Sequence, residues 1–160
     1  MAVKVLFVCT GNICRSPISQ GVFERVLRRE GLQDEVEVDS AGTGAWHVGS
    51  TPAERAIETA AARGLDISGQ RARTISPEDC ACFDYVLTMD EDNFRSVSAT
   101  CGGSAVVRPF LDFDPDSPER EVPDPYFGGP GGFERVIDLV EAASEGLFED
   151  IRERYLSGGV

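Results

Sequence analysis

A cysteine and an arginine flank a short loop near the start of the chain. Residues 9–16 read CTGNICRS, so five residues separate Cys9 from Arg15. A loop of this kind between a buried strand and a helix presents backbone N–H groups and the positive end of a helix dipole to an anion. Gly11 permits a tight turn, and Asn12 tolerates the left-handed conformation that such a loop needs. The pattern predicts a site for a phosphate group.

The side chains of this loop are suited to phosphoryl transfer. Arg15 carries a planar guanidinium that matches two phosphate oxygens. Oriented N–H dipoles and Arg15 both favour the thiolate of Cys9, which is a nucleophile when it faces the phosphorus of a bound monoester. Ser16 can donate a hydrogen bond to Cys9 or cap the following helix. A buried structural cysteine is the alternative, but the strand before the loop and the Ser-Pro helix start after it favour catalysis.

The hydrophobic pattern around the loop predicts the elements that hold it. The apolar run 3–8 is typical of a strand covered on both faces, as in parallel sheets. Ser16 and Pro17 are expected to be the N-cap and first residue of a helix that ends at Gly31. A second, weaker strand is predicted at 36–41.

Strands and helices alternate along the rest of the chain. The capping-box pattern at Thr51 predicts a helix that ends near Arg63, and Ser76 starts another short helix. The remaining predicted elements are strands at 84–89 and 105–110 and helices at 90–99 and 133–155. This order predicts an α/β fold, in which residues 1–160 form one domain with a doubly wound sheet of about four parallel strands flanked by helices. Ligands bind beyond the carboxyl ends of such strands, so the site should begin at Cys9.

A long loop over residues 111–132 is rich in proline, glycine and acidic residues. Loops of this length in small domains are commonly functional. Pro123 and Pro125 restrict the backbone on both sides of Asp124. A carboxyl group held there can protonate the leaving oxygen of a substrate bound at Cys9. An acidic turn without a catalytic role is the alternative.

The charge of the chain limits its partners. Fifteen basic and 28 acidic residues give a net charge of −13, which argues against a nucleic acid or an anionic membrane as partner. Residues 1–30 nevertheless carry +3, and screening over about 8 Å allows a local anion site to persist. The sequence contains neither a membrane-spanning apolar run nor a recognisable signal peptide, so a cytoplasmic location is expected.

The five cysteines are expected to be reduced thiols, because their number is odd and no secretory signal precedes them. A zinc site is not expected, because the chain has no Cys-x-x-Cys pair and His47 is its only histidine. Cys80 and Cys82 are predicted to be packing residues and His47 a surface residue. Cys14 is either a small buried side chain or the partner of Cys9 in a reversible disulfide formed under oxidants.

The segment VLFVCTGNICRSP closely resembles the phosphate-binding loop of the low-molecular-weight protein tyrosine phosphatases. Further blocks match the family in the same order and extend the resemblance over residues 3–155: SAGTGAWHVG at 40–49, AERA at 53–56, FDYVLTMD at 83–90 and VPDPYFGG at 122–129. The resemblance implies a four-stranded parallel sheet and hydrolysis of phosphotyrosine through a phosphocysteine intermediate, without a metal or other cofactor. It implies phosphotyrosine-containing proteins as substrates and inorganic phosphate as product and inhibitor.

The resemblance also assigns residues by position. It makes Cys9 the nucleophile, Arg15 the ligand of the phosphoryl group and Asp124 the general acid and base. Asn12 and Ser40 resemble a pair that braces the loop through a side-chain hydrogen bond. The residues expected to contact substrate are Thr10, Gly11, Asn12, Ile13, Cys14, Ser16, Trp46, Tyr126 and Phe127. Of these, Ser16 resembles the residue that stabilises the thiolate, and the three aromatic residues resemble the walls of the slot.

Two positions depart from the family pattern. Many members have histidine in place of Gln70 and pair it with the residue that matches Asp90, so this contact must differ here. Many members also have two tyrosines after the Asp-Pro pair, and Phe127 lacks the second hydroxyl.

Three other functions are weighed against phosphotyrosine hydrolysis. Phosphoarginine phosphatases resemble this chain but carry threonine where it has Ile13. Thioredoxin-coupled arsenate reductases need two further cysteines in a relay, and Cys80 and Cys82 are too closely spaced for it. A phosphate-binding module without catalysis would be expected to lack Cys9 or Asp124.

The side chain at position 13 is predicted to set the choice between aryl phosphates and phosphoarginine. Ile13→Thr replaces an apolar wall by a hydrogen-bonding one and should lower the preference for aryl phosphates by about 1–3 kcal/mol. The ratio of kcat/KM for the two substrates measures this preference. An unchanged ratio would mean that Ile13 does not determine it.

Overall fold

Four parallel strands form the centre of the structure, a computed structural model that describes residues 2–104, 106–125, 129 and 131–156. The strands are β1 (Val3–Cys9), β2 (Val36–Gly42), β3 (Tyr85–Thr88) and β4 (Val107–Pro109). They pair in the order β2-β1-β3-β4. The predicted α/β fold with a four-stranded parallel sheet is therefore confirmed.

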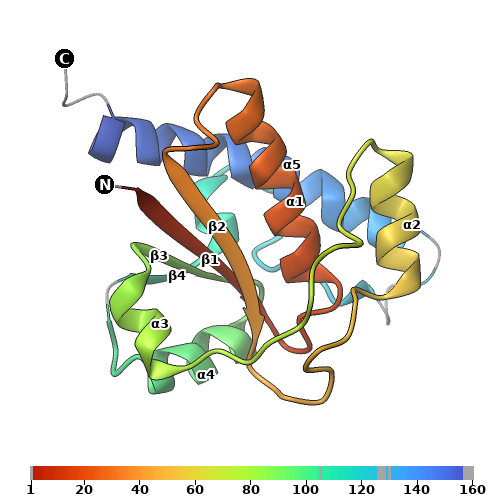
Figure 1. Ribbon diagram of the computed structural model, residues 1–160, viewed down its shortest axis with the longest axis horizontal. Coiled ribbons are helices and arrows are strands. Elements are labelled where there is room, and N and C mark those ends of the chain that lie inside the picture. The colour runs from red at the N-terminus through yellow and green to blue at the C-terminus, as the bar shows by residue number, and fades with distance from the viewer. Residues whose placement is uncertain (1, 105, 126–128, 130, 157–160) are drawn as a thin grey trace.

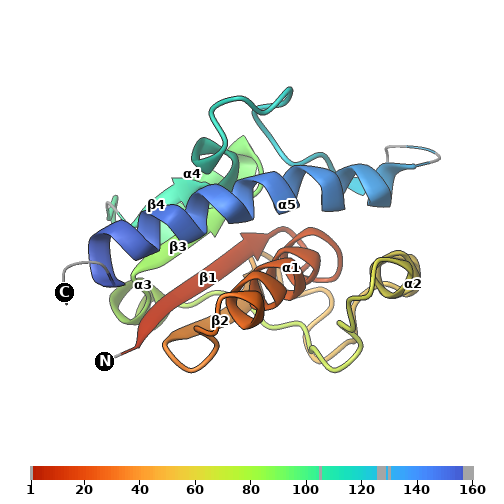
Figure 2. The same cartoon turned by 90° about the horizontal axis from the view of Figure 1, so that it is seen from above.

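Helices cover both faces of this sheet (Figure 1). They are α1 (Arg15–Arg29), α2 (Glu54–Ala62), α3 (Pro77–Cys82), α4 (Glu91–Thr100) and α5 (Gly132–Ile151), with a 3₁₀ helix η1 (Phe110–Phe113) and a π-helical turn η3 (Arg152–Leu156). The two longest helices, α1 and α5, pack against each other on one face, and α4 packs on β3 and β4. Figure 2 shows α2 beside the N-terminal half of α5. Within the described ranges, no helix is long and apolar enough to cross a membrane.

The alternation of side chains along β1 explains why both faces are covered. Val5 and Phe7 belong to the core under α1 and α5, whereas Leu6 and Val8 belong to the core beside α4. All four side chains are fully buried, as the apolar run 3–8 predicts. Cys9 is the last residue of β1, so the loop that follows it lies at the carboxyl edge of the sheet.

Parallel register brings three further segments to this edge. Cys9 is opposite Gly42 at the end of β2, so Ser40 lies close behind the loop. Val8 is opposite Thr88 at the end of β3, and Asp90 follows two residues later. The segments after β1, β2 and β3 therefore meet where the sequence places the site.

Two helices begin at different residues from those predicted. Helix α1 starts at Arg15 with Cys14 as N-cap, because the hydroxyl of Ser16 is occupied inside the loop instead of capping the helix. Helix α2 starts at Glu54, with Ala53 in an extended conformation at the N-cap. The Ala53 N–H donates to the carbonyl of Ile13 at 2.8 Å, so a tertiary contact sets this helix start instead of Thr51.

The prediction that the cysteines are reduced is wrong for one pair. Cys80 in α3 forms a disulfide with Cys101, which follows α4, across a Cα–Cα distance of 5.4 Å. Cys82 is an exposed thiol, so neither it nor Cys80 is the simple packing residue that was predicted. The pairing was not predictable from spacing, because 21 residues separate the two cysteines and helix packing brings them together.

A close approach between η1 and α5 gives a stability test. A Cβ atom at Gly146 would lie 1.8 Å from the carbonyl oxygen of Phe113. Gly146→Ala should therefore destabilise the protein by about 1–3 kcal/mol through overpacking, although alanine normally favours a helix over glycine by roughly 1 kcal/mol. Urea unfolding measures the change. A variant at least as stable as the parent would contradict this close approach.

Candidate active site

The loop after β1 is held from outside by the segment 43–53. The carbonyls of Cys9, Thr10 and Ile13 accept hydrogen bonds of 2.8–3.0 Å from backbone amides of that segment. The C=O and N–H groups of a trans peptide point in opposite directions. The N–H of each following residue therefore points away from the 43–53 segment, which is how a loop presents amides to an anion.

Asn12 is the residue that fixes the shape of the loop. It adopts a left-handed conformation with φ of 58° and is buried. Its Nδ2 donates to the hydroxyls of Ser16 at 2.8 Å and Ser40 at 3.0 Å, and its Oδ1 accepts the backbone N–H of Arg73 at 2.9 Å. The hydrogen bond between Asn12 and Ser40 that the resemblance implies is thus present. These three contacts offset the cost of the left-handed backbone.

Two polar groups point at the sulfur of Cys9. The Ser16 hydroxyl lies 3.0 Å from Sγ, and the Asn12 backbone N–H donates to Sγ at 3.3 Å. Cys9 itself is only 2% exposed. Both groups can stabilise a negative charge on the sulfur, which is the form of cysteine that acts as a nucleophile.

Arg15 is a buried cation held in a fixed orientation. Its Nη1 donates to Asp90 Oδ2 at 2.6 Å and to the Val122 carbonyl at 3.1 Å, and its Nη2 donates to Thr10 Oγ1 at 3.3 Å. Burial on its own would lower the pKa of Arg15, but the nearby Cys9 and Asp90 outweigh it and raise this pKa. The contact with Val122 also brings the loop that carries Asp124 close to the guanidinium.

A pocket of about 150 Å³ unites the three residues expected to be catalytic. Its lining comprises Cys9, Thr10, Gly11, Ile13, Cys14, Arg15, Trp46, His47 and Asp124. Trp46 is 74% exposed and lies at the rim. Asn12 and Ser16 are not among the lining residues and act on Cys9 from behind. Tyr126 and Phe127 lie outside the described residues.

The structure adds His47 to the site. It is on the surface, as predicted, but it also lines the pocket, and its ring carbon Cδ2 would lie 3.1 Å from a Cβ at Gly11. Its position next to Trp46 in the glycine-rich segment is the signal that could have indicated this.

Gly44 makes room for the neighbouring indole, because a Cβ there would lie 1.8 Å from Trp46 Cζ3.

Gln70 makes different contacts from the family histidine described above. Its Nε2 donates to the Pro17 carbonyl at 3.0 Å, and its Oε1 accepts from the Ser40 hydroxyl at 3.5 Å. Asp90 binds Arg15 and caps α4 by accepting the Asn93 N–H. Gln70 thus supports the same serine that braces Asn12, with an amide that does not titrate.

Other parts of the described structure offer less chemistry. A larger cavity of about 490 Å³ lies between α1 and α5. Its described lining of valine, alanine, arginine and glutamate side chains contains no nucleophile beside an anion-binding loop. Among the described residues, no group of three or more histidine, cysteine or acidic side chains is placed to hold a metal.

Known proteins resemble this chain over almost its full length. The family model described as low molecular weight phosphotyrosine protein phosphatase matches residues 4–156. The low molecular weight protein-tyrosine phosphatase A of Mycobacterium tuberculosis is 41% identical over 159 residues, which cover 98% of this chain and 96% of that protein. The crystal structure of YfkJ from Bacillus subtilis is similar with a TM-score of 0.92 and 36% identity, covering 97% and 98% of the two chains. The crystal structure of DARP, the Drosophila arginine phosphatase, is similar with a TM-score of 0.84 and 30% identity, covering 94% and 98%.

The carboxamide of Asn12 gives a test of how the loop is held. Asn12→Ala removes three hydrogen bonds and leaves a left-handed alanine, which should destabilise the fold by about 2–4 kcal/mol. Asn12→Gly relieves the backbone strain and should recover roughly 1 kcal/mol of this loss. Both variants should bind inorganic phosphate about tenfold more weakly, because the loop loses its brace. Urea unfolding and titration with phosphate measure the two effects. Phosphate affinity at the parent level in Asn12→Gly would show that only the backbone conformation matters.

Proposed function

The chain belongs to the low molecular weight phosphotyrosine protein phosphatase family, and we propose that it hydrolyses phosphotyrosine monoesters through a phosphocysteine intermediate on Cys9. Membership makes it a phosphoric monoester hydrolase. The observation that carries the proposal is that Cys9, Arg15 and Asp124 line one small pocket, which the loop after β1 helps to form.

Binding of the phosphoryl group is assigned to the loop and Arg15. The loop amides donate hydrogen bonds to the phosphoryl oxygens, and the guanidinium binds two of these oxygens as a fork. Asp90 and the Val122 carbonyl hold Arg15 from the side away from the ligand. A guanidinium held in this way needs little reorganisation when the phosphoryl charge moves in the transition state.

In the first chemical step the thiolate of Cys9 attacks phosphorus. The S–P bond forms while the bond from phosphorus to the tyrosine oxygen breaks, and Asp124 gives its proton to that oxygen. A phenolate is a basic leaving group, with a conjugate pKa near 10, so a proton donor accelerates its departure. Ser16 and the Asn12 N–H stabilise the sulfur as an attacking and later as a leaving group.

In the second step water releases the phosphoryl group. Asp124, now a carboxylate, takes a proton from the attacking water. The P–O bond to water forms, the S–P bond breaks, and Cys9 returns to the thiolate. Inorganic phosphate is the product, and it inhibits because it occupies the same loop.

The lining of the pocket favours an aromatic phosphate monoester in a protein substrate. Ile13 and Trp46 offer apolar surface to a flat ring. The likeness to an arginine phosphatase supports phosphoarginine as a second candidate substrate, but Ile13 lacks the hydroxyl that could orient a nitrogen leaving group. Arsenate reduction is less well supported, because Cys80 is joined to Cys101 and neither lines the pocket.

The proposed function also bears on the domain boundaries and the cellular compartment of the protein. We take residues 1–160 as one phosphatase domain, which the family match over 4–156 supports. A cytoplasmic location suits the need of Cys9 for reducing conditions, under which the Cys80–Cys101 disulfide would be open to reduction.

The role of Asp124 predicts a leaving-group effect. Asp124→Asn has no proton to give, so the first step should slow by about 10²–10⁴-fold for phosphotyrosine. The loss should be much smaller for p-nitrophenyl phosphate, because its anion leaves readily. The kcat/KM of the parent should follow a bell-shaped pH profile, since Cys9 must be ionised while Asp124 is protonated. Single-turnover kinetics with both substrates separate this step from the second.

Asp116→Asn is a matched control, because Asp116 is an exposed acid of the same long loop that does not line the pocket. It should leave both rates near the parent value. Equal losses for the two substrates in Asp124→Asn would exclude Asp124 as the acid and direct the search to Asp90 or the carboxylates of 112–121.

A further inference from the structure

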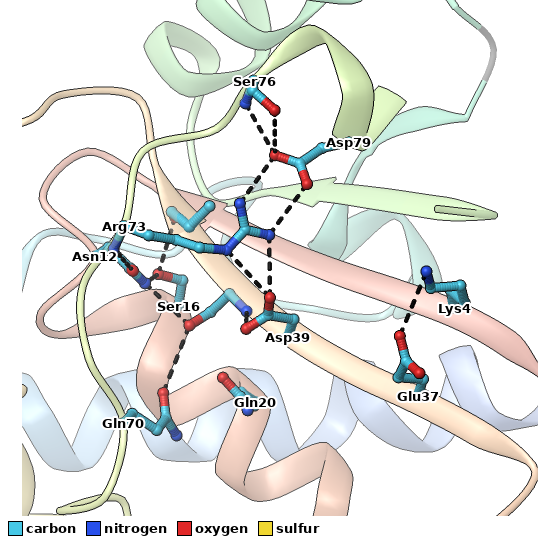
Figure 3. Close-up of polar contacts among 12 residues, drawn as sticks. Lys4, Asn12, Ser16, Gln20, Glu37, Asp39, Gln70, Arg73, Ser76 and Asp79 are labelled. Carbon is cyan, nitrogen blue, oxygen red and sulfur yellow. Dashed lines mark hydrogen bonds and ion pairs between the residues drawn. The ribbon is translucent and has the colours of Figure 1, made fainter. Parts of the chain in front are cut away.

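Arg73 lies outside the pocket and is held by two carboxylates from different elements. Its guanidinium contacts both carboxylate oxygens of Asp79 in α3, at 3.0 and 3.2 Å. On its other side it contacts Asp39 Oδ2 in β2, with Nε at 3.1 Å and Nη2 at 3.0 Å. Figure 3 shows the guanidinium between these two acids. A planar fork with both of its sides engaged is a rigid anchor.

Asp79 is itself fixed by the start of α3. It accepts the Ser76 N–H at 2.9 Å, which is one of the two hydrogen bonds of the capping box of this helix. It also accepts the Ser76 hydroxyl at 3.3 Å. Burial alone would raise the pKa of Asp79, but hydrogen bonds from Arg73 and Ser76 outweigh it and lower this pKa. The acid therefore remains a carboxylate partner for Arg73 at neutral pH.

The backbone of Arg73 contacts the phosphate-binding loop. Its N–H donates to Asn12 Oδ1 at 2.9 Å, and its carbonyl accepts the Gly42 N–H at 2.8 Å. The segment around it pairs with β2 only through an isolated bridge between Gly42 and Thr74. Backbone hydrogen bonds of Ala72 with Gly49 and Ser50 also hold this segment. The side chain of Arg73 adds a charged anchor at the residue that contacts Asn12.

We propose that Arg73 is a positioning residue of the phosphatase site: the clamp by Asp39 and Asp79 holds its backbone N–H against Asn12 and so fixes the groups that face the Cys9 sulfur. The path has three contacts, from Arg73 to Asn12, from Asn12 to the Ser16 hydroxyl, and from Ser16 to Cys9. Arg73 touches neither substrate nor the reacting atoms. A role of Arg73 in turnover rests on the function proposed above. Its effect on the reactivity of the Cys9 sulfur does not.

Two other roles for the clamp give different results. If Arg73 acts only through its charge, removing the cation disfavours the Cys9 thiolate, and removing the Asp79 charge favours it. If the clamp only stabilises α3, its loss lowers the free energy of unfolding and leaves Cys9 unchanged. If Arg73 acts by positioning, loss of either Arg73 or Asp79 disfavours the Cys9 thiolate, because each loss frees Asn12 to move.

The experiment measures alkylation of Cys9 by iodoacetamide across pH, with peptide mapping to separate Cys9 from the other thiols. Arg73→Met and Asp79→Asn should both move the pH midpoint of Cys9 alkylation upward. At pH 6 both should slow the reaction by roughly three- to tenfold, the factor that one hydrogen bond contributes. Arg73→Lys should give an intermediate rate, because an ammonium cannot bridge two carboxylates as a fork. Inorganic phosphate should protect Cys9 less well in Arg73→Met than in the parent.

Arg71→Met is the matched control, because Arg71 is an exposed neighbour whose guanidinium contacts only the Ser68 and Gln70 carbonyls among the described residues. Cys9 of this variant should be alkylated at the same rate as Cys9 of the parent protein. Opposite shifts in Arg73→Met and Asp79→Asn, or parent midpoints in both despite lower stability in urea, would overturn the proposal. Alkylation needs no turnover, so a parent protein inactive on p-nitrophenyl phosphate would refute the proposed function and leave this test intact.

Discussion

The site depends on one buried carboxamide, that of Asn12. A loop that points its amides at an anion cannot satisfy them with its own carbonyls, so it needs support from other segments. Asn12 provides that support by accepting the left-handed conformation and binding β2 through Ser40, α1 through Ser16 and the segment before α3 through Arg73. Three parts of the fold thereby converge on a single side chain. Its neighbour Ser16 transmits the arrangement to the sulfur of Cys9.

The second constraint is electrostatic, because the proposed substrate is an anion and the chain as a whole is acidic. The net charge is −13, but the site uses local and directed charge instead of the overall field. Arg15 is 3% exposed, and Asp90 and the Val122 carbonyl hold one edge of its guanidinium. Charges on the distant surface are screened within about 8 Å at physiological salt. We therefore propose that a buried arginine together with loop amides is enough to bind a phosphoryl group.

The sheet and the loop could be predicted because their signals lie in short stretches of consecutive residues. The apolar run of β1, the Cys9 to Arg15 spacing and the helix start at Ser76 are each contained within a few residues. Features that depend on distant partners were missed or mistaken. Ser16 is a residue type favoured at N-caps, and the predicted cap is wrong because Cys14 holds that position. The contact of its hydroxyl with Cys9 was the predicted alternative, whereas its contact with Asn12 was missed. The Cys80–Cys101 disulfide and the contact of Arg73 with Asn12 join segments 21 and 61 residues apart, which no local pattern encodes.

The covalent role of Cys9 is the central claim, and trapping the intermediate tests it most directly. The parent enzyme would be quenched rapidly during turnover of p-nitrophenyl phosphate, and the phosphoryl group located by peptide mapping. We expect one phosphoryl group on Cys9, in larger amount in Asp124→Asn because its second step is slow, and we expect Cys9→Ala to abolish turnover. Turnover that continues in Cys9→Ala, or a phosphoryl group on any other residue of the parent, would contradict it.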